Sequence, residues 1–234
     1  MTFQSTVRLV QTIGIAGQVI FDGPQRAEPN ILKTVDPANN VIGRAFTAVA
    51  ANQGQVVAGG SGAFAGILID SLIYASGGTL AGGPLAPTVI LPNELTAEFL
   101  KMGTVIVDLL NAASIGDLVA FATADGQLSA VAPVAAFTAS QATTVLTVSA
   151  ITAGVLGVGS IVRNAAGEVL GEIISLGTGT GGIGTYNLNT SATVGSAAMT
   201  ANSVAGVGKT FIPNTKVVRQ NTPSAGLAFI QLTN

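Results

Sequence analysis

The fold is decided by a stretch that begins Phe137-Thr138-Ala139-Ser140 and ends Ala197-Ala198-Met199-Thr200. Small and β-branched residues dominate this stretch, and its run Thr144-Val145-Leu146-Thr147-Val148 has the composition of a β-strand. The stretch therefore predicts a complete β module.

Two hairpins are expected inside this module. The first joins the short runs on either side of the turn residues Asn164-Ala165-Ala166-Gly167. The second joins residues 173–176 to residues 185–188 across the glycine-rich run at 177–184. Residues 185–188 alternate between polar and apolar side chains, which is typical of a half-buried strand.

The module lies between two halves of another domain. The sequence predicts an outer domain made of residues 1–134 plus 203–234, and an inserted module of residues 135–202. Small-residue tracts at 132–136 and 201–208 are expected to be the linkers, because such tracts suit a domain boundary. At 234 residues the chain is long enough for two modest cores.

The start of the outer domain is expected to be extended. Residues 5–21 alternate loosely and contain two glycines, which favours an arm or an edge strand over a helix. Gly23-Pro24 and Glu28-Pro29-Asn30 are expected to break the chain. Residues 31–35 and 41–49 flank polar turn residues, and this pattern predicts a hairpin.

The remaining segments are also expected to be strand and loop. Residues 93–102 fit either a short capped helix or a strand that continues through residues 104–107, and the strands predicted around them favour the strand. Asp125-Gly126 between two apolar runs is the strongest hairpin signal in the chain. A Gly/Pro-rich segment at 76–87 is expected on the surface. The last two strands are expected at residues 215–219 and 226–232.

Composition supports an all-β fold and a covered surface. Aromatic residues make up 5% of the chain and Trp is absent, which favours thin β layers: a small barrel or sandwich-like outer domain with a sandwich-like inserted module. Charged residues make up 9%, whereas roughly a quarter to a third is usual on the surface of a soluble protein. Because interface cores are depleted in charge, other subunits are expected to cover much of this surface.

Charge and hydropathy exclude two kinds of partner. The formal net charge is −2, and Arg8, Arg26, Lys33 and Arg44 are scattered, so no nucleic-acid-binding patch is predicted. These cations could instead pair with acidic groups on a partner. No apolar run approaches the roughly 20 residues of a membrane span, and the N-terminal residues lack a signal-peptide pattern. The protein is therefore expected to work in the cytoplasm where it is made, or in a particle assembled there.

Two glycine-rich motifs match the sequence pattern of nucleotide-binding loops but lack the context that such loops need. Gly177-Thr178-Gly179-Thr180-Gly181-Gly182 matches G-x-G-x-x-G, but a strand is expected after it, and a dinucleotide site needs a helix N-terminus there. Gly206-Val207-Gly208-Lys209-Thr210 ends like a phosphate-binding loop, yet Ser203 stands where the first glycine belongs. We interpret the first as a loop and the second as a turn with an exposed lysine.

The inventory of reactive side chains predicts no catalytic, cofactor-binding or metal-binding residue. The chain has no histidine and no cysteine, which excludes a Ser-His-Asp triad, a thiol nucleophile and the usual zinc sites. Glu168 and Glu172 would lie about 13 Å apart on one strand face at ~3.3 Å per residue. That exceeds the roughly 9.5 Å limit of an inverting glycosidase pair. Asp108 and Asp117 are interpreted as part of a polar connection, because a calcium loop needs denser oxygen ligands.

The outer domain resembles the structural cement, or capsid decoration, proteins of tailed bacteriophages. The resemblance covers most of residues 1–134 and 209–234. Short glycine-containing pieces carry it in a fixed order: Ile31-Leu32-Lys33-Thr34-Val35, Gly43-Arg44-Ala45-Phe46, Phe64-Ala65-Gly66-Ile67, Gly103-Thr104-Val105-Ile106-Val107, Gly116-Asp117-Leu118-Val119 and Ala225-Gly226-Leu227-Ala228-Phe229-Ile230.

The inserted module is similar to a Gly/Thr-rich β module of phage tail and virion proteins. The matching pieces are Thr147-Val148, residues 154–159, residues 177–186, residues 193–196 and Met199-Thr200. The chain departs from that pattern at residues 163–168, where such modules are richer in glycine, so a ligand of other copies does not carry over to this one.

These resemblances imply a non-enzymatic virion protein on the outer surface of an icosahedral phage head. Its implied partners are the major capsid protein and itself, as a homotrimer, and its implied action is to stabilise the head by bridging neighbouring capsomers. The module would project outward, where a host-surface glycan is a candidate ligand. Two rival hypotheses stay open: a tail-fibre or adhesin-like host-binding protein, and a hydrolase that uses Glu168 and Glu172.

Overall fold

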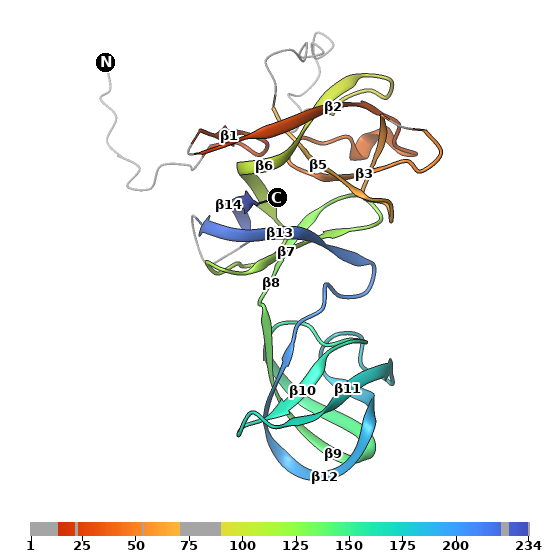
Figure 1. Ribbon diagram of the computed structural model, residues 1–234, viewed down its shortest axis with the longest axis vertical. Helices are drawn as coiled ribbons and strands as arrows, with labels where there is room; N and C mark the ends of the chain where they lie inside the picture. Colours follow the sequence, from red (N-terminus) through yellow and green to blue (C-terminus); the bar gives the residue numbers. More distant parts are fainter. Residues whose placement is uncertain (1–13, 22, 53, 71–89, 221–224, 234) are drawn as a thin grey trace, which may run out of the picture.

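The computed structural model describes residues 14–21, 23–52, 54–70, 90–220 and 225–233 (Figure 1). Within these ranges the chain forms strands and one 3₁₀ turn, Pro37–Asn39, with no α-helix, so the all-β prediction is confirmed. None of the described residues belongs to a helix that could cross a membrane. The strands are β1 Val19–Ile20, β2 Arg26–Leu32, β3 Ala45–Ala48, β4 Gln55–Ala58, β5 Phe64–Leu68, β6 Thr96–Leu109, β7 Leu118–Ala122, β8 Leu128–Val131, β9 Val134–Ala153, β10 Ile161–Asn164, β11 Val169–Leu176, β12 Gly184–Asn202, β13 Lys209–Gln220 and β14 Gly226–Leu232.

Five strands close a first small barrel, barrel 1. β6 pairs with β2, β2 with β4, β4 with β3 and β3 with β5, and β5 returns to β6. Phe46 and Phe99 fill its interior, with both side chains fully buried and their ring centroids 5.1 Å apart in an edge-to-face contact. Leu32, Val56 and Leu68 surround this pair. Closure pairs most strands of barrel 1 on both edges, and the first part of β2 keeps one edge without a partner strand.

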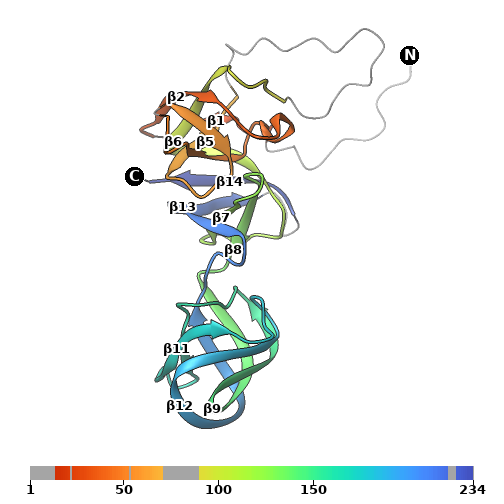
Figure 2. The same cartoon turned by 90° about the vertical axis from the view of Figure 1, so that its right-hand side faces the viewer.

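Barrel 2 shares β6 with barrel 1. β6 pairs with β14, β14 with β13, β13 with β7 and β7 with β8, and β8 returns to β6. Val105, Phe121, Val217 and Ile230 lie in a second buried cluster, which also includes Ala45 and Ile67 of barrel 1. The 14 residues of β6 span about 46 Å at ~3.3 Å per residue, which is long enough to serve both barrels. Figures 1 and 2 show β6 crossing from one barrel to the other.

The second half of β6 is buried on both faces. Val105 and Val107 point into barrel 2, whereas Ile106 is covered from outside by the segment that leads into β1. That segment is held by two backbone hydrogen bonds: Gly17 N donates to Ile106 O at 2.7 Å, and Ile106 N donates to Gln18 O at 2.9 Å. A strand covered on both faces carries a continuous apolar run, and residues 105–107 are such a run.

Strands β9 to β12 form a separate four-stranded antiparallel sheet. β9 and β12 are its two long strands, of 20 and 19 residues, and they pair from Val148↔Gly184 to Val134↔Asn202. The hairpin of β10 and β11 packs against them, and β10 also pairs with β12, so the sheet curls over its own core. Phe137, Leu146 and Tyr186 lie in this core. Figures 1 and 2 show the sheet at the end of the molecule opposite β1 and β2.

Several predicted strands and turns are confirmed. Both module hairpins form, around residues 164–167 and 177–184. The Asp125-Gly126 turn joins antiparallel β7 and β8. Residues 93–102 lead into strand β6 and not into a helix, and the last two strands are β13 and β14.

Other predictions in barrel 1 are wrong. Residues 31–35 and 41–49 do not form a hairpin, because β4 lies between β2 and β3 and pairs with both. Within the second range, strand begins at Ala45, while Val41 makes an isolated bridge to Ile90. Glu28-Pro29-Asn30 does not break the chain but lies inside β2. Pro29 is tolerated because β2 pairs with β4 only at Ile31 and Leu32, so its other edge is open at Pro29.

The predicted linkers are longer than the observed ones. β8 ends at Val131 and β9 begins at Val134, so Ala132-Pro133 alone joins them, and on the return path residues 203–208 lie between β12 and β13. The small residues 134–136 and 201–202, which were predicted to be linker, belong to strands β9 and β12, whose pairing continues to Val134↔Asn202. The surface loop predicted at 76–87 and most of the arm predicted at 5–21 lie outside the described residues; the described part of the arm includes β1.

Candidate functional site: a groove between the two barrels

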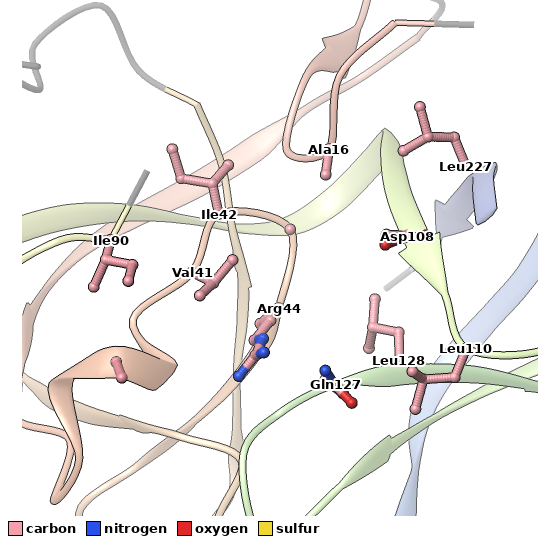
Figure 3. A pocket seen from close by; sticks show the side chains of 12 residues that line it. Ala16, Val41, Ile42, Arg44, Ile90, Asp108, Leu110, Gln127, Leu128 and Leu227 are labelled. Atoms are coloured by element: carbon pink, nitrogen blue, oxygen red, sulfur yellow. The ribbon is translucent and has the colours of Figure 1, made fainter. Parts of the chain in front are cut away.

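A hollow of about 520 Å³ opens where barrel 1 meets barrel 2, and we refer to it as the inter-barrel groove (Figure 3). Its lining comes from segments far apart in the chain. The residues that line it are Ala16, Ala38, Val41, Ile42, Gly43, Arg44, Ile90, Asp108, Leu110, Gln127, Leu128 and Leu227. Most of these side chains are apolar, and Ile90 and Leu110 are 52% and 55% exposed. Exposed apolar side chains around a hollow are typical of an interaction site.

A close backbone contact shapes one wall of the groove. Gly17 and Gly43 both have left-handed backbones, with φ of +84° and +86°. A Cβ atom at Gly17 would lie 2.0 Å from Ile42 Cγ2, and one at Gly43 would lie 3.0 Å from Ala16 Cβ. Glycine at these positions therefore allows the segment before β1 to lie directly on the turn before β3. Gly43 N further anchors this turn by donating to Leu68 O at 2.7 Å.

Arg44 is the cation of the groove, and it is held within the chain. Its Nη1 donates to Asn39 Oδ1 at 2.9 Å and to Asp125 O at 3.2 Å, and lies 3.9 Å from Asp125 Oδ2. The Arg44 side chain is 18% exposed. This cation therefore fixes the turn between β7 and β8 against the turn before β3, which joins the two barrels beneath the groove.

Asp108 differs from Arg44 in having no fixed counter-charge. Its side chain is exposed near the end of β6, and no ion pair or hydrogen bond of its carboxylate is found among the described residues. In Figure 3 it faces the same hollow as Gln127 and Leu227. The groove thus exposes polar and apolar surface in about equal parts, and within the described part of the chain its acidic side chain, Asp108, forms no ion pair.

Two of the scattered cations, Lys33 and Arg26, form ion pairs within barrel 1. Lys33 Nζ donates to Glu94 Oε1, and Arg26 Nε lies 3.8 Å from Glu28 Oε1. Lys101 Nζ also donates to Glu28 Oε2, across the β2–β6 pair. This hydrogen bond, aided by the charges of both cations, lowers the pKa of Glu28 below its ordinary value, and burial opposes the shift. Arg8 lies outside the described residues.

Glu168 and Glu172 were predicted to lie on one face of a strand, and the structure places them differently. Glu168 precedes β11, and its carboxylate accepts a hydrogen bond from Asn164 Nδ2 at 2.8 Å. The register between β10 and β11 shifts between Val162 and Arg163, so one extra residue lies between Glu168 and Glu172 on the β11 side. Both glutamates are exposed. The expectation of one shared strand face is therefore wrong, because a bulge interrupts the two-residue repeat.

The glycine-rich loops have structural contacts. Residues 177–182 lead into β12 and not into a helix, and the Tyr186 hydroxyl closes this loop by donating to Gly182 O at 2.7 Å while accepting from Gly181 N at 3.1 Å. Burial raises the pKa of Tyr186 above its ordinary value, against the opposite effect of the Gly181 N–H. Gly206-Val207-Gly208-Lys209-Thr210 leads into strand β13. Its lysine is half-buried rather than exposed, and Lys209 Nζ donates to Ser129 Oγ at 2.9 Å.

The acidic connection between Asp108 and Asp117 is a turn. Asp117 Oδ2 accepts from Ser114 N at 2.7 Å, and Asp108 lies in β6 before the turn starts. Among the described residues, no three His, Cys, Asp or Glu side chains are grouped so that they could hold a metal ion. The groove itself was missed by sequence reasoning, because its residues are scattered from Ala16 to Leu227 and no local pattern links them.

The two barrels and the four-stranded sheet define the class of the fold, an all-β protein, and the groove is its candidate contact site. Comparison with protein families narrows this class. Residues 3–233 match the family described as structural cement protein (E217 gp24/Pam3 gp6), so the chain belongs to the phage structural cement protein family. No curated protein matched the sequence.

Family membership decides several sequence-based predictions. The resemblance to phage structural cement proteins is confirmed, and the chain is a structural protein of the phage virion. The family is non-enzymatic, which rules out the hydrolase hypothesis based on Glu168 and Glu172. A cement protein binds the capsid, so a capsid partner follows from membership.

Proposed function

We propose that this protein decorates the outer surface of an icosahedral phage head as a homotrimer and stabilises the head by bridging neighbouring capsomers. Barrels 1 and 2 bind the shell, and the module of residues 135–202 projects outward. The way in which the module leaves barrel 2 is the observation that carries this proposal. Val134 and Asn202 pair across the base of the module, and Ser203 N donates to Pro133 O at 3.1 Å.

This attachment supports separate roles for the barrels, which would bind the shell, and for the module, which would project from it. The module has its own buried cluster, which shares no residue with the clusters of the barrels. It lies at the end of the molecule opposite β1 and β2 (Figure 2). A protein bound to the shell through the β1 end would therefore hold the module away from the shell.

Low charge supports contact with other subunits. Charged residues make up 9% of the chain, and three of the described cations are already paired within barrel 1. Few charges are thus left to be desolvated when the barrels meet an apolar surface. In a trimer, three contacts with the lattice would act together, and effective concentration would convert modest single affinities into persistent binding.

The proposal is tested with heads from a phage that lacks this protein. Purified protein added to such heads should bind in hundreds of copies per particle, measured from a stained gel against the major capsid protein, and should raise the temperature at which the heads release DNA. A handful of copies per particle would favour a tail component instead. Normal copy number with no gain in heat stability would refute stabilisation.

A host-surface glycan stays a candidate ligand of the module. Full-length protein on a glycan array would test this role, with a variant lacking residues 135–202 as the control. Binding that disappears with the module would support it, and equal signals from both proteins would refute it.

A further inference from the structure

We propose that the outer face of the β10–β11 hairpin is a two-fold contact site, at which the module of one copy binds the module of a second copy (Figure 1). This inference deepens the proposed function, on which it rests for the place of the contact: copies held on a head would touch through their projecting modules. Four exposed side chains define the site, which we call the hairpin face: Ile161 and Arg163 on β10, and Val169 and Glu172 on β11.

Exposed apolar side chains gather on this part of the module. Val158, Ile161, Val169 and Ile174 are between 40% and 58% exposed. The exposed positions of β9 and β12 hold Ala, Gly, Ser, Thr and Asn instead, apart from Val134 at the base of the module. Apolar side chains that are exposed together on one part of a surface are typical of an interaction site.

Strand register places the two charges of the hairpin face on one diagonal and its two apolar side chains on the other. Ile161 lies opposite Glu172, and Arg163 lies opposite Val169. Val162 is fully buried between the two β10 residues, so Ile161 and Arg163 point to the same, outer side. Charged and apolar side chains therefore alternate around the four corners of the face.

This arrangement is complementary to a copy of itself. A two-fold axis along the line from Ile161 to Val169 exchanges the positions of Arg163 and Glu172. In two modules related by that axis, each Arg163 faces Glu172 of the other copy. Each apolar side chain on the axis meets its own equivalent. Two ion pairs then flank two apolar contacts, so the surfaces match in charge and in polarity.

Both charges are available for this contact. Neither Arg163 nor Glu172 forms an ion pair with another described residue. Arg163 Nη1 donates to Gly167 O at 3.0 Å, and the other N–H groups of the guanidinium can still bind a carboxylate. An uncharged ligand would leave both charges unpaired. A second copy supplies both counter-charges at the required spacing.

The contact is small, and the head makes a small contact sufficient. Four side chains from each copy provide much less area than a stable interface between free proteins. Copies bound side by side on a head have a high effective concentration, so a weak contact between them forms often. Such a contact adds little to the affinity of a single copy for the head, which the barrels provide under the proposed function.

Cross-linking at the axis tests the contact. The chain has no cysteine, so Ile161→Cys introduces a single thiol, and the axis brings position 161 of both copies together. Packed sheets lie about 10 Å apart, beyond the reach of a disulfide, so a short bis-maleimide is used as the cross-linker. Full-length Ile161→Cys should form a linked dimer. Ile183→Cys, at a 64% exposed site before β12, should link about tenfold more slowly, because a random encounter lacks the oriented contact. Equal rates would overturn the proposal.

Charge reversal tests the pairing. Added to Ile161→Cys, Arg163→Glu sets carboxylates against each other at both ends of the contact, and Glu172→Arg does the same with guanidinium groups. Each change should slow cross-linking about tenfold. A mixture of the two variants should recover the original rate and yield dimers with one copy of each, because opposite charges then meet at both ends. Thr147→Glu, on the exposed side of β9, is the control and should leave the rate unchanged. Unchanged rates in the single variants, or no recovery in the mixture, would overturn the proposal.

Binding to heads is measured in parallel, so that the two proposals can fail separately. Arg163→Glu should load onto heads in normal copy number, because the barrels bind the shell. Protein that loads onto heads while the mixture shows no recovery refutes the contact and leaves the decoration role standing. Recovery in the mixture by a protein that never loads onto heads supports the contact and refutes the decoration role.

Discussion

The contact of Gly17 with Ile42 gives the sharpest test of how the groove is built. Replacing Gly17 by Ala adds a Cβ atom 2.0 Å from Ile42 Cγ2 and 3.1 Å from Asp70 N, at a φ of +84°. A side chain in the left-handed region costs about 1–2 kcal/mol. Overpacking costs about 1–3 kcal/mol more. We therefore expect Gly17→Ala to lower the free energy of unfolding by about 2–5 kcal/mol.

Gly54→Ala is the matched control. Gly54 has almost the same backbone, with a φ of +86°, but no heavy atom lies within 4 Å of an added Cβ. This variant should lose about 1–2 kcal/mol, the conformational cost without the clash. The difference between the two variants therefore isolates the close approach to Ile42. Adding Ile42→Ala to Gly17→Ala should recover part of the loss, because it removes the clashing Cγ2 atom.

The assay must separate the barrels from the module, because a chain with two cores need not unfold in one step. Urea unfolding followed by circular dichroism gives the total change, and amide hydrogen exchange read peptide by peptide locates it. Gly17→Ala should speed exchange in β6 and leave β12 unaffected. If Gly17→Ala proved no more destabilising than Gly54→Ala, the close backbone contact at the groove wall would be disproved.

Three further changes test other parts of the structure. Phe99→Ala should cost about 3–5 kcal/mol in urea unfolding, because it empties the centre of barrel 1; a loss below 1 kcal/mol would contradict that core. Tyr186→Phe should cost about 1–3 kcal/mol and speed exchange in β12, since Gly182 O loses its donor; unchanged exchange would contradict the loop closure. Because the folded pKa of Tyr186 is raised, its contribution should persist below pH 10 and fall as the pH rises further, an effect absent in Tyr186→Phe. The pKa of Glu28 is lowered by Lys101, so its small contribution should persist above pH 4.5 and fall as the pH drops below it; equal acid sensitivity in Glu28→Gln would contradict this.

Local turn chemistry was predictable from the sequence, whereas long-range pairing was not. Asp125-Gly126 forms its hairpin because the turn and both strands are adjacent in the chain. The predicted hairpin of residues 31–35 and 41–49 fails because β4, later in the chain, pairs with both β2 and β3. The turn at 36–40 is compatible with either arrangement, so no local signal could separate them.

The groove lay beyond sequence reasoning for the same reason. Ala16, Arg44, Asp108 and Leu227 belong to segments that meet only when both barrels have closed on β6. The absence of catalytic residues was easier to predict than the groove, because that prediction depends on amino-acid composition alone. It argued against catalysis before any contact was known, and family membership agrees with that inference.

The most direct test of the account is the binding of a module-free chain to undecorated heads. Residues 135–202 are replaced by a short Gly-Ser turn, which the adjacent Pro133 and Ser203 can accept because they are already hydrogen-bonded at 3.1 Å. The copy number per head and the dissociation constant of this variant are then compared with those of the full chain. If the barrels bind the shell, both values should stay within about twofold, a change of about 0.4 kcal/mol. Loss of binding by a variant whose barrels remain folded would contradict the account.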